Sequence, residues 1–219
     1  MAPAEQSYIE VPMRPSFHAA LATFGMLISI ASANAAPAGD TSSPATTFDK
    51  ERFSKEVTQS PDLPNFHEVH PFLYRSGGPT EAGFAKLKDY NIKTVIDLRA
   101  PTEKGAKDEP EWAKQQGIKY IRLVMSSKAP TKEQVDTFLK ETKAAEKDPS
   151  KGAVLVHCAH GSDRTGCLVG IWRVTEDGYT YPQAYKEMRH YWFTPKFTNL
   201  SSTVEKYADE SGRRKSAAK

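Results

Sequence analysis

The segment AVLVHCAHGSDRTG (residues 153–166) decides the fold, because it leads from an apolar run through a loop into a helical pattern. Its first five residues predict a short buried strand, and from Thr165 apolar residues recur at helical spacing until Gly178. Gly161 and Gly166 ease the backbone between the two, so that successive N–H groups can turn toward a tetrahedral oxyanion. The segment therefore predicts a phosphate-binding loop between a strand and a helix.

The rest of the chain alternates between predicted strands and helices. Strands are expected at residues 66–77 (an extended pair), 93–98 and 118–124, and helices at residues 80–91, 131–142, 182–189 and 195–208. Strands separated by helices imply right-handed crossovers, and thus an α/β fold with a central, mainly parallel sheet flanked by helices. Ligands of such sheets bind at the carboxyl ends of the strands, which is where Cys158 lies.

Length and charge indicate the size of the fold and argue against a nucleic-acid-binding protein. The 219 residues, 38% of them hydrophobic, suffice for one core of ordinary size, and the formal net charge of +3 is mild. Lys and Arg are spread along the chain, apart from GRRK at residues 212–215, so nucleic acid is not an expected partner.

The N-terminal residues 1–35 have the pattern of a bacterial signal peptide. Arg14 precedes an apolar run at residues 19–30, and a small-residue site that ends at Ala35 follows. We therefore expect cleavage after Ala35 and an exported protein, periplasmic or secreted. A single membrane anchor is the alternative, although the run is short for a permanent transmembrane helix, so no stable membrane insertion is expected.

Two acidic residues complicate this interpretation. Glu5 and Glu10 are unusual at the start of an export peptide, which leaves Met13 as an alternative initiator. After the signal peptide the sequence predicts a flexible lead-in (residues 36–60), one folded domain (61–210) and a basic tail (211–219).

The loop also carries the residue types that phosphoryl chemistry needs. Arg164 offers a planar fork that can hold two phosphate oxygens, which a lysine cannot do. The same positive field favours the thiolate of Cys158. Thr165 can donate its hydroxyl to that sulfur or to the phosphoryl group, and His157 is expected to orient the loop through a backbone contact. The residues expected to bind substrate phosphate are Ala159, His160, Gly161, Ser162, Asp163, Arg164 and Thr165.

The stretch HCAHGSDRTG resembles the H-C-x5-R-T signature of the cysteine-dependent tyrosine and dual-specificity phosphatase superfamily. Residues 65–99 and 187–193 are similar to bacterial dual-specificity-like phosphatases, exported tyrosine phosphatases among them, and to the atypical plant and fungal group. The resemblance implies a protein tyrosine phosphatase-like fold for the domain. It also implies a two-step reaction, in which Cys158 takes the phosphoryl group, Arg164 and the loop amides stabilise the transition state, and water hydrolyses the phosphocysteine. Such enzymes need no metal or cofactor, and no cluster in the sequence has metal-ligand spacing.

A general acid is missing from the place where the family carries it. Many relatives have an aspartate on a mobile loop before the cysteine, whereas MSSKAPTKEQ (residues 125–134) contains none. Asp163 is the first candidate to protonate the leaving oxygen, a contribution of roughly 10²- to 10⁴-fold in rate. Its place resembles that of an aspartate in the loop of the myotubularin lipid phosphatases. The alternative is that Asp163 only braces the loop through a salt bridge or amide contacts.

Other acidic residues are weaker candidates. Glu133 comes next, although its place in the first turn of a predicted helix equally suits a role in complementing the helix dipole. Asp97 is expected to orient the end of a strand. Asp108, Glu109 and Glu111 are expected to be solvated.

Several further residues have two interpretations each. His160 either contacts substrate phosphate or projects into solvent. Arg75 and Arg99 either widen the positive field or pair with structural carboxylates. Cys167 is either a small buried side chain or a partner for a reversible disulfide with Cys158. Four aromatic residues either wall the pocket or pack in the core: Tyr185, Tyr191, Trp192 and Phe193.

Three functions remain open, and a fourth is argued against. The leading one is a protein phosphatase acting on phosphotyrosine or phosphoserine/threonine, with a phosphorylated protein as partner. An inositol phosphate or phosphoinositide phosphatase is the alternative, although the loop lacks the lysines that would favour it. A domain that binds phosphorylated partners without turnover conflicts with the intact Cys158, Arg164 and Thr165. A sulfurtransferase would not need the arginine at this spacing.

Overall fold

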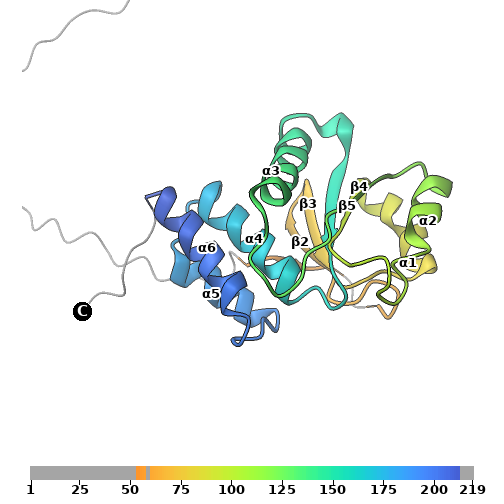
Figure 1. Cartoon of the computed structure of the whole chain (residues 1–219). Helices are drawn as coiled ribbons and strands as arrows, with labels where there is room; N and C mark the ends of the chain where they lie inside the picture. Colours follow the sequence, from red (N-terminus) through yellow and green to blue (C-terminus); the bar gives the residue numbers. More distant parts are fainter. Residues whose placement is uncertain (1–52, 58–59, 213–219) are drawn as a thin grey trace, which may run out of the picture. The chain divides into compact units, whose positions relative to one another are not determined.

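The structure is a computed structural model that describes residues 53–57 and 60–212 (Figure 1). The predicted signal peptide at residues 1–35, most of the predicted lead-in and residues 213–219 of the tail lie outside the described residues. These predictions are therefore not tested by the structure.

A six-stranded sheet in the order β1-β2-β3-β6-β4-β5 forms the centre of the domain. The strands are β1 (Lys55–Glu56), β2 (His67–His70), β3 (Leu73–Ser76), β4 (Ile92–Asp97), β5 (Lys119–Arg122) and β6 (Ala153–His157). Neighbouring strands from β3 to β5 are parallel, whereas β2 and β1 are added antiparallel at one edge. The predicted α/β fold with a mainly parallel sheet is confirmed.

Helices cover both faces of the sheet (Figure 1). One face carries α1 (Glu81–Lys86), the short 3-10 helix η2 (Leu87–Tyr90) and α2 (Glu109–Gln115). On the other face lie α3 (Lys132–Lys147) and α4 (Asp163–Thr175), and α5 (Tyr181–His190) and α6 (Thr198–Glu210) pack against α4 (Figure 1). The short 3-10 helix η3 (Pro149–Lys151) leads into β6. A hydrophobic cluster lies on each face of the sheet, and β6 contributes to both because its alternate residues point to opposite faces. Val154 and Val156 belong to one cluster, and Ala153 and Leu155 belong to the other.

Two helices show why the sequence pattern worked. Helix α3 begins after Thr131 with the predicted capping box, in which the Thr131 hydroxyl and the Gln134 side chain each accept an N–H of the other residue. Helix α4 is buried continuously from Thr165 to Val174, so its N-terminus is held at the carboxyl end of β6. It begins at Asp163, inside the loop motif.

The structure differs from the prediction at the end of the lead-in. Phe53 and Ser54 are buried, and β1 pairs with β2. Glu187 of α5 accepts hydrogen bonds from Ser54 N at 3.1 Å and Ser54 Oγ at 2.8 Å. Residues 53–57 therefore belong to the domain, because Ser54 supplies hydrogen-bond donors to the buried carboxylate of Glu187.

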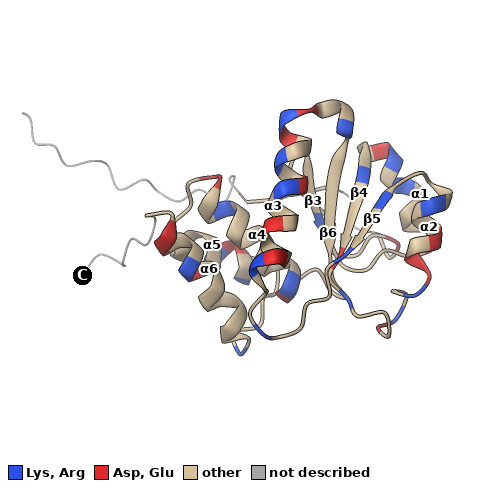
Figure 2. Cartoon of the chain, turned by 45° about the horizontal axis from the view of Figure 1, so that its top comes forward, with Lys and Arg blue, Asp and Glu red and all other residues tan. Residues whose placement is uncertain are grey.

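Charged residues of both signs are interspersed over the helices (Figure 2). This distribution agrees with the mild net charge and shows no basic stripe on the described part of the chain. In residues 53–57 and 60–212, no helix combines the length and the apolar character needed to span a membrane.

Candidate active site

Cys158 lies at the carboxyl end of β6, at the start of the loop that leads into α4. Its side chain is 3% exposed, and the Gly161 N–H donates to Cys158 Sγ at 3.3 Å. The sulfur thus has a backbone donor aimed at it from within the loop, at the position from which a cysteine nucleophile would attack.

The backbone of this loop is held from the sheet side by three hydrogen bonds. Ala159 O accepts from Gly78 N at 3.1 Å, His160 O from Asn65 Nδ2 at 3.1 Å, and Gly161 O from Arg75 Nη2 at 2.8 Å. Within one peptide unit the carbonyl and the following N–H point in opposite directions. Because three successive carbonyls are directed toward the sheet side, the N–H groups that follow them are directed into the concave side of the loop.

Gly161 is required by this arrangement. Its φ is +74°, a conformation that side chains disfavour, and a Cβ built there would lie 2.5 Å from the Ser76 carbonyl oxygen. Only glycine fits, which agrees with its predicted role in the loop. Gly166, in contrast, lies in the first turn of α4, where its N–H donates to Ser162 O at 3.0 Å.

Arg164 is oriented by a carboxylate that sequence reasoning missed. Its Nη1 and Nη2 donate to the two carboxylate oxygens of Glu103 at 2.7 and 2.8 Å, and Nη1 also donates to Leu98 O and Met125 O. Glu103 is itself fixed, since its Oε1 accepts from Ala100 N at 2.8 Å. The hydrogen bonds from Arg164 lower the pKa of Glu103, and those to Glu103 raise the pKa of Arg164.

The remaining edge of the Arg164 guanidinium can bind an oxyanion. Among the described residues, Nε and the second Nη2 hydrogen have no acceptor, and these two donors lie side by side on the planar group. Such an edge can hold two phosphate oxygens while Glu103 holds the other edge. Nothing in the charged stretch TEKGAKDEPE distinguishes Glu103 from its neighbours, so no sequence signal identifies it.

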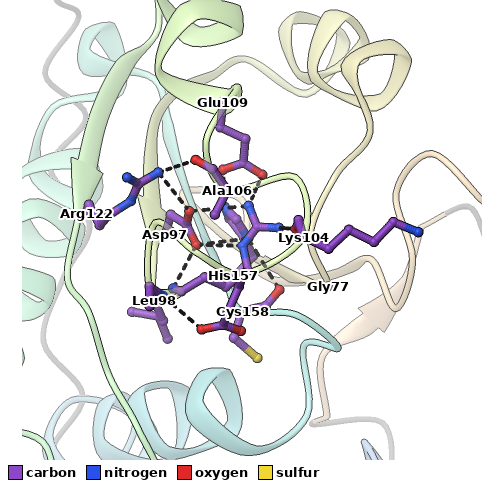
Figure 3. A network of polar contacts seen from close by, with 12 residues as sticks. Gly77, Asp97, Leu98, Lys104, Ala106, Glu109, Arg122, His157 and Cys158 are labelled. Carbon is purple, nitrogen blue, oxygen red and sulfur yellow. Dashed lines mark hydrogen bonds and ion pairs between the residues drawn. The ribbon is translucent and has the colours of Figure 1, made fainter.

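A buried ionic network lies beneath the loop (Figure 3). Asp97 Oδ1 accepts from Arg99 N at 2.9 Å and from Arg99 Nε at 3.0 Å, so Asp97 orients the end of β4 as expected. Glu109 contacts Arg99 through its Oε1, and its Oε2 lies 3.2 Å from His157 Nε2. Burial opposes ionisation of Asp97, yet the charges of His157 and Arg99 outweigh it and keep the pKa of Asp97 lowered.

Glu109 corrects the sequence analysis. The prediction that it is solvated is wrong, because its side chain is fully buried, whereas Asp108 and Glu111 are exposed as predicted. No helix was predicted between the strands at residues 93–98 and 118–124, but α2 begins at Glu109, with Pro110 in its first turn. This start places Glu109 against Arg99, which would otherwise be a buried cation with a single carboxylate partner.

The network also has the composition of a metal site. Ligand atoms of Asp97, Glu109 and His157 lie within 4.8 Å of one another, although the sequence showed no metal-ligand spacing. Arg99 donates to both carboxylates and therefore supplies the positive charge that such a cluster needs. We interpret the cluster as an ion-pair network.

His157 connects this network to the nucleophile. Its Nδ1 lies 3.5 Å from Cys158 O and 3.8 Å from Asp97 Oδ1, and its Nε2 faces Glu109. The expected backbone contact is thus present but long. Carboxylate oxygens therefore lie near both ring nitrogens, but His157 Nε2 and Glu109 Oε2 make no hydrogen bond within the described ranges.

The two arginines that were singled out have different environments. Arg99 pairs with structural carboxylates, whereas buried Arg75 forms no ion pair with any described residue. The Arg75 guanidinium lies 4.3 Å from the centre of the Tyr191 ring and donates to the loop carbonyl of Gly161. Burial lowers the pKa of Arg75, while Glu187, Tyr191 and Cys158 act in the opposite direction. Arg75 therefore supplies the positive field beneath the loop.

A cleft of about 700 Å³ opens over the loop. Its lining residues are Ser126, Ser127, His160, Ser162, Asp163, Arg164, Trp192, Thr194, Lys196, Phe197 and Leu200. Asp163 is the one carboxylate in this set, and Glu133 is exposed elsewhere on the first turn of α3. Exposed His160 is placed where it could meet substrate.

Asp163 has a structural contact as well as a place in the cleft. Its Oδ1 accepts from Thr194 N at 2.7 Å, so the bracing interpretation holds in part, through an amide of the α5–α6 connection. Its Oδ2 has no hydrogen-bond partner among the described residues.

Thr165 Oγ1 is buried and likewise has no partner within the described ranges, so the predicted bond to Cys158 is not formed in this structure.

The aromatic set divides between core and cleft. Tyr191 and Phe193 are buried and Tyr185 packs against the core, but Trp192 is exposed and lines the cleft.

Both cysteines are free. Cys167 is fully buried, donates to Leu200 O at 3.4 Å, and has its pKa raised to about 12 by burial. This agrees with the interpretation of Cys167 as a small buried side chain.

Residues 52–206 match the family described as PTP-NADK, DSP-PTPase phosphatase fused to NAD+ Kinase. The chain belongs to this DSP-PTPase family. The superfamily that the loop motif resembles is thereby confirmed. The matched residues include the loop and every element of the sheet.

Curated relatives include both protein and inositol phosphatases. The dual specificity protein phosphatase TpbA of Pseudomonas aeruginosa is 29% identical over 126 residues, which are 58% of this chain and 54% of TpbA. The inositol diphosphatase DSP3 of Arabidopsis thaliana is 34% identical over 111 residues, 50% of this chain and 53% of DSP3. The inositol diphosphatase SIW14 of Saccharomyces cerevisiae is 29% identical over 154 residues, 68% of this chain and 53% of SIW14. The chain spans about half the length of these relatives.

Solved structures share the fold. The crystal structure of P. aeruginosa TpbA has a TM-score of 0.60 at 24% identity, covering 74% of this chain and 98% of that one. A putative phosphatase (DUF442) from Shewanella putrefaciens has a TM-score of 0.53 at 26% identity, covering 66% and 94%. The predicted protein tyrosine phosphatase-like fold is confirmed by these likenesses.

Proposed function

We propose that this protein is a cysteine-dependent phosphatase that hydrolyses phosphate monoesters, with phosphorylated tyrosine or serine/threonine in proteins as substrate. The observation that carries the proposal is the arrangement around Cys158. A sulfur that accepts a backbone N–H at 3.3 Å lies at the base of a loop whose carbonyls are held outward, beside an arginine with one free edge. The family membership and the name of TpbA support the same reaction.

The geometry supports a reaction in two steps. In the first, the Cys158 thiolate attacks phosphorus, an S–P bond forms and the P–O bond to the leaving group breaks. The loop N–H groups and the free edge of Arg164 hold the equatorial oxygens, as preorganised donors for the transition state. In the second, water attacks phosphorus, the S–P bond breaks, and phosphate leaves with the thiolate restored.

Asp163 is proposed to donate the proton to the leaving oxygen and to accept one from water in the second step. It is the carboxylate of the cleft, and its Oδ2 is not engaged by any described residue. Asp163→Asn should reduce kcat far more on a substrate with a poor leaving group, such as a phosphoserine peptide, than on para-nitrophenyl phosphate. Equal losses on both would assign Asp163 to bracing Thr194 alone.

The proposed activity is tested with para-nitrophenyl phosphate and the variant Cys158→Ser. We expect turnover by the wild-type protein and none above background by the variant. Tight binding of a phosphopeptide without any turnover would support the binding-module alternative instead. Cyanide-dependent turnover of thiosulfate would favour a sulfurtransferase.

An inositol phosphate phosphatase is the second candidate. It is favoured by relatives named inositol diphosphatases, DSP3 and SIW14 among them. A panel of phosphopeptides and inositol phosphates at equal concentration decides between the two, because kcat/KM compares competing substrates directly.

We also propose that the protein is exported and cleaved after Ala35, since residues 1–35 have the pattern of a signal peptide. N-terminal sequencing of protein recovered from outside the cytoplasm should then read from Ala36. A start at Met1 or Met13 in that fraction would contradict cleavage.

A further inference from the structure

Trp192 occupies a backbone position that normally belongs to glycine. Helix α5 ends with the two hydrogen bonds of a Schellman motif: Phe193 N donates to Met188 O at 3.0 Å, and Trp192 N donates to Arg189 O at 3.2 Å. The residue between the last helical residues and Phe193 must be left-handed, and Trp192 has a φ of +62°. The other two non-glycine residues with positive φ in the described ranges, Asn65 and Asn91, are of the type that tolerates it.

The strain at Trp192 is not offset by packing. Its side chain is 66% exposed, and its indole makes no ring contact or hydrogen bond with any described residue. The flanking Tyr191 and Phe193 are buried, so the core contacts of this segment are made by the neighbours of Trp192 and not by Trp192 itself. Residues held in sparsely populated conformations are found preferentially at functional sites.

The place of Trp192 indicates what the side chain does. It lines the cleft above the loop together with Phe197, and the segment between them is tied to the loop by the Thr194 N–H on Asp163. The Lys196 ammonium lies 5.4 Å from the centre of the Phe197 ring. An exposed indole and a second aromatic ring thus stand at the mouth of the site where phosphate is expected.

We propose that Trp192, with Phe197, binds the phenyl ring of phosphotyrosine and selects it over aliphatic phosphate esters. This inference rests on the proposed phosphatase function and narrows its substrate class. Rings that pack face-to-edge or offset add attraction beyond the area they bury, which an aliphatic side chain cannot supply. Trp192 is a specificity residue here, and the reacting atoms remain with Cys158 and Arg164.

The charges of the cleft favour this substrate over an inositol polyphosphate. Two cations, Arg164 and Lys196, and one carboxylate, Asp163, line it. Arg164 is already paired with Glu103. A ligand with many phosphates would need more cations than these, whereas a single phosphate is served by the loop N–H groups and one arginine.

The test is Trp192→Gly, because glycine relieves the left-handed strain while removing the ring. We expect the melting temperature to stay the same or rise, the KM for a phosphotyrosine peptide to rise roughly tenfold, and the inhibition constant of vanadate to remain unchanged. Vanadate occupies the phosphate site but has no ring. Trp192→Tyr, which retains an aromatic ring, should have a KM close to that of the wild type.

Asn91→Gly is the matched control, since Asn91 is also left-handed (φ +53°) but lies at the end of η2, away from the cleft. It should leave the KM unchanged. The proposal is overturned if Trp192→Gly lowers the melting temperature, if it leaves the KM unchanged, or if KM and the vanadate constant rise together. A wild-type preference for inositol polyphosphates would also overturn it. Absence of Cys158-dependent turnover on any ester would refute the proposed function itself, and this inference with it.

Discussion

The two sides of the catalytic loop are built on opposite principles. Its floor, which we define as Arg75, Asp97, Arg99, Glu109 and His157, is made of charged or titratable residues that are at most 2% exposed. Its rim, Trp192 and the cleft residues beside it, is exposed and includes a strained backbone position. The difference teaches that the charges which prepare the phosphate site are fixed before substrate arrives, while the groups that meet the rest of the substrate stay accessible.

Removing a charge from the floor should have the largest effect on folding. Glu109→Ala leaves buried Arg99 with one carboxylate and removes the carboxylate that lies 3.2 Å from Nε2 of buried His157. Breaking a buried ion pair by removing one partner destabilises a protein by about 3–5 kcal/mol. Urea unfolding followed by circular dichroism measures the change in the free energy of unfolding.

Glu111→Ala is the control on the same helix, because Glu111 is exposed and its ion pair with Lys114 is a surface pair at 4.0 Å. Its effect should be about 0.5 kcal/mol or less. Similar losses from both variants would show that the floor is no more than a solvated ion cluster.

Acid should weaken the floor through a neighbouring histidine. Burial lowers the pKa of His67 to about 4, and Arg75 and His190 add to the shift. Below pH 6.5 His67 binds a proton in the unfolded chain but stays neutral in the folded protein. The free energy of unfolding is therefore highest above pH 6.5 and falls by about 1.4 kcal/mol per pH unit down to about pH 4. His67 holds Asn65, which in turn donates to the loop carbonyl of His160.

His67→Gln tests this pH dependence, since glutamine can also donate to Asn65 without titrating. Between pH 7 and pH 5 the wild-type protein should lose about 2 kcal/mol more stability than the variant. His190→Gln, which removes one of the smaller contributors to the pKa shift of His67, should give a profile slightly less steep than the wild type. A wild-type profile that is no steeper than that of His67→Gln would contradict the assignment.

A smaller effect is expected where the floor meets the rim, at Glu103. Glu103→Gln removes the charge that orients Arg164 but keeps one acceptor, so we expect kcat/KM for para-nitrophenyl phosphate to fall roughly tenfold. Stability should change by less than about 1 kcal/mol, because this pair is partly exposed. Glu141→Gln, which breaks the surface pair with Lys119, is the matched control. A rise in kcat/KM would mean that Glu103 competes with substrate for Arg164.

Sequence reasoning succeeded where the determinants are contiguous. The loop residues from Cys158 to Thr165, the buried run of β6 and the capping box at Thr131 are each encoded within a few residues, so local pattern and propensity suffice. It failed at Glu109 and missed Glu103. Their environments depend on Arg99 and Arg164, which reach them only after the sheet and the loop have formed.

Neighbours in sequence can also mislead. Trp192 stands between two buried aromatic residues, and hydrophobicity alone assigns all three to the core. The left-handed end of α5 instead turns Trp192 into solvent beside the loop. Residues 53–57 show the reverse case, since their composition suggests a flexible lead-in but Glu187 and β2 hold them in the domain.

The smallest effect is expected at Cys167. Its fully buried thiol, with a pKa raised to about 12 by burial, should resist iodoacetamide at pH 8 while Cys158 reacts, as peptide mapping would show. Cys167→Ala should keep kcat within about twofold of wild type, since no step of the proposed reaction uses this thiol. Thiol-reversible inactivation by peroxide that requires Cys167 would instead establish the disulfide with Cys158.

The central claim is that the sulfur of Cys158 carries the phosphoryl group during turnover. The direct measurement is acid quenching of the protein within one turnover of a 32P-labelled phosphotyrosine peptide, followed by mapping of the label. The account predicts labelling at Cys158 in the wild type and in Cys167→Ser, and none in Cys158→Ser. Label on another residue, or full turnover by Cys158→Ser, would contradict it.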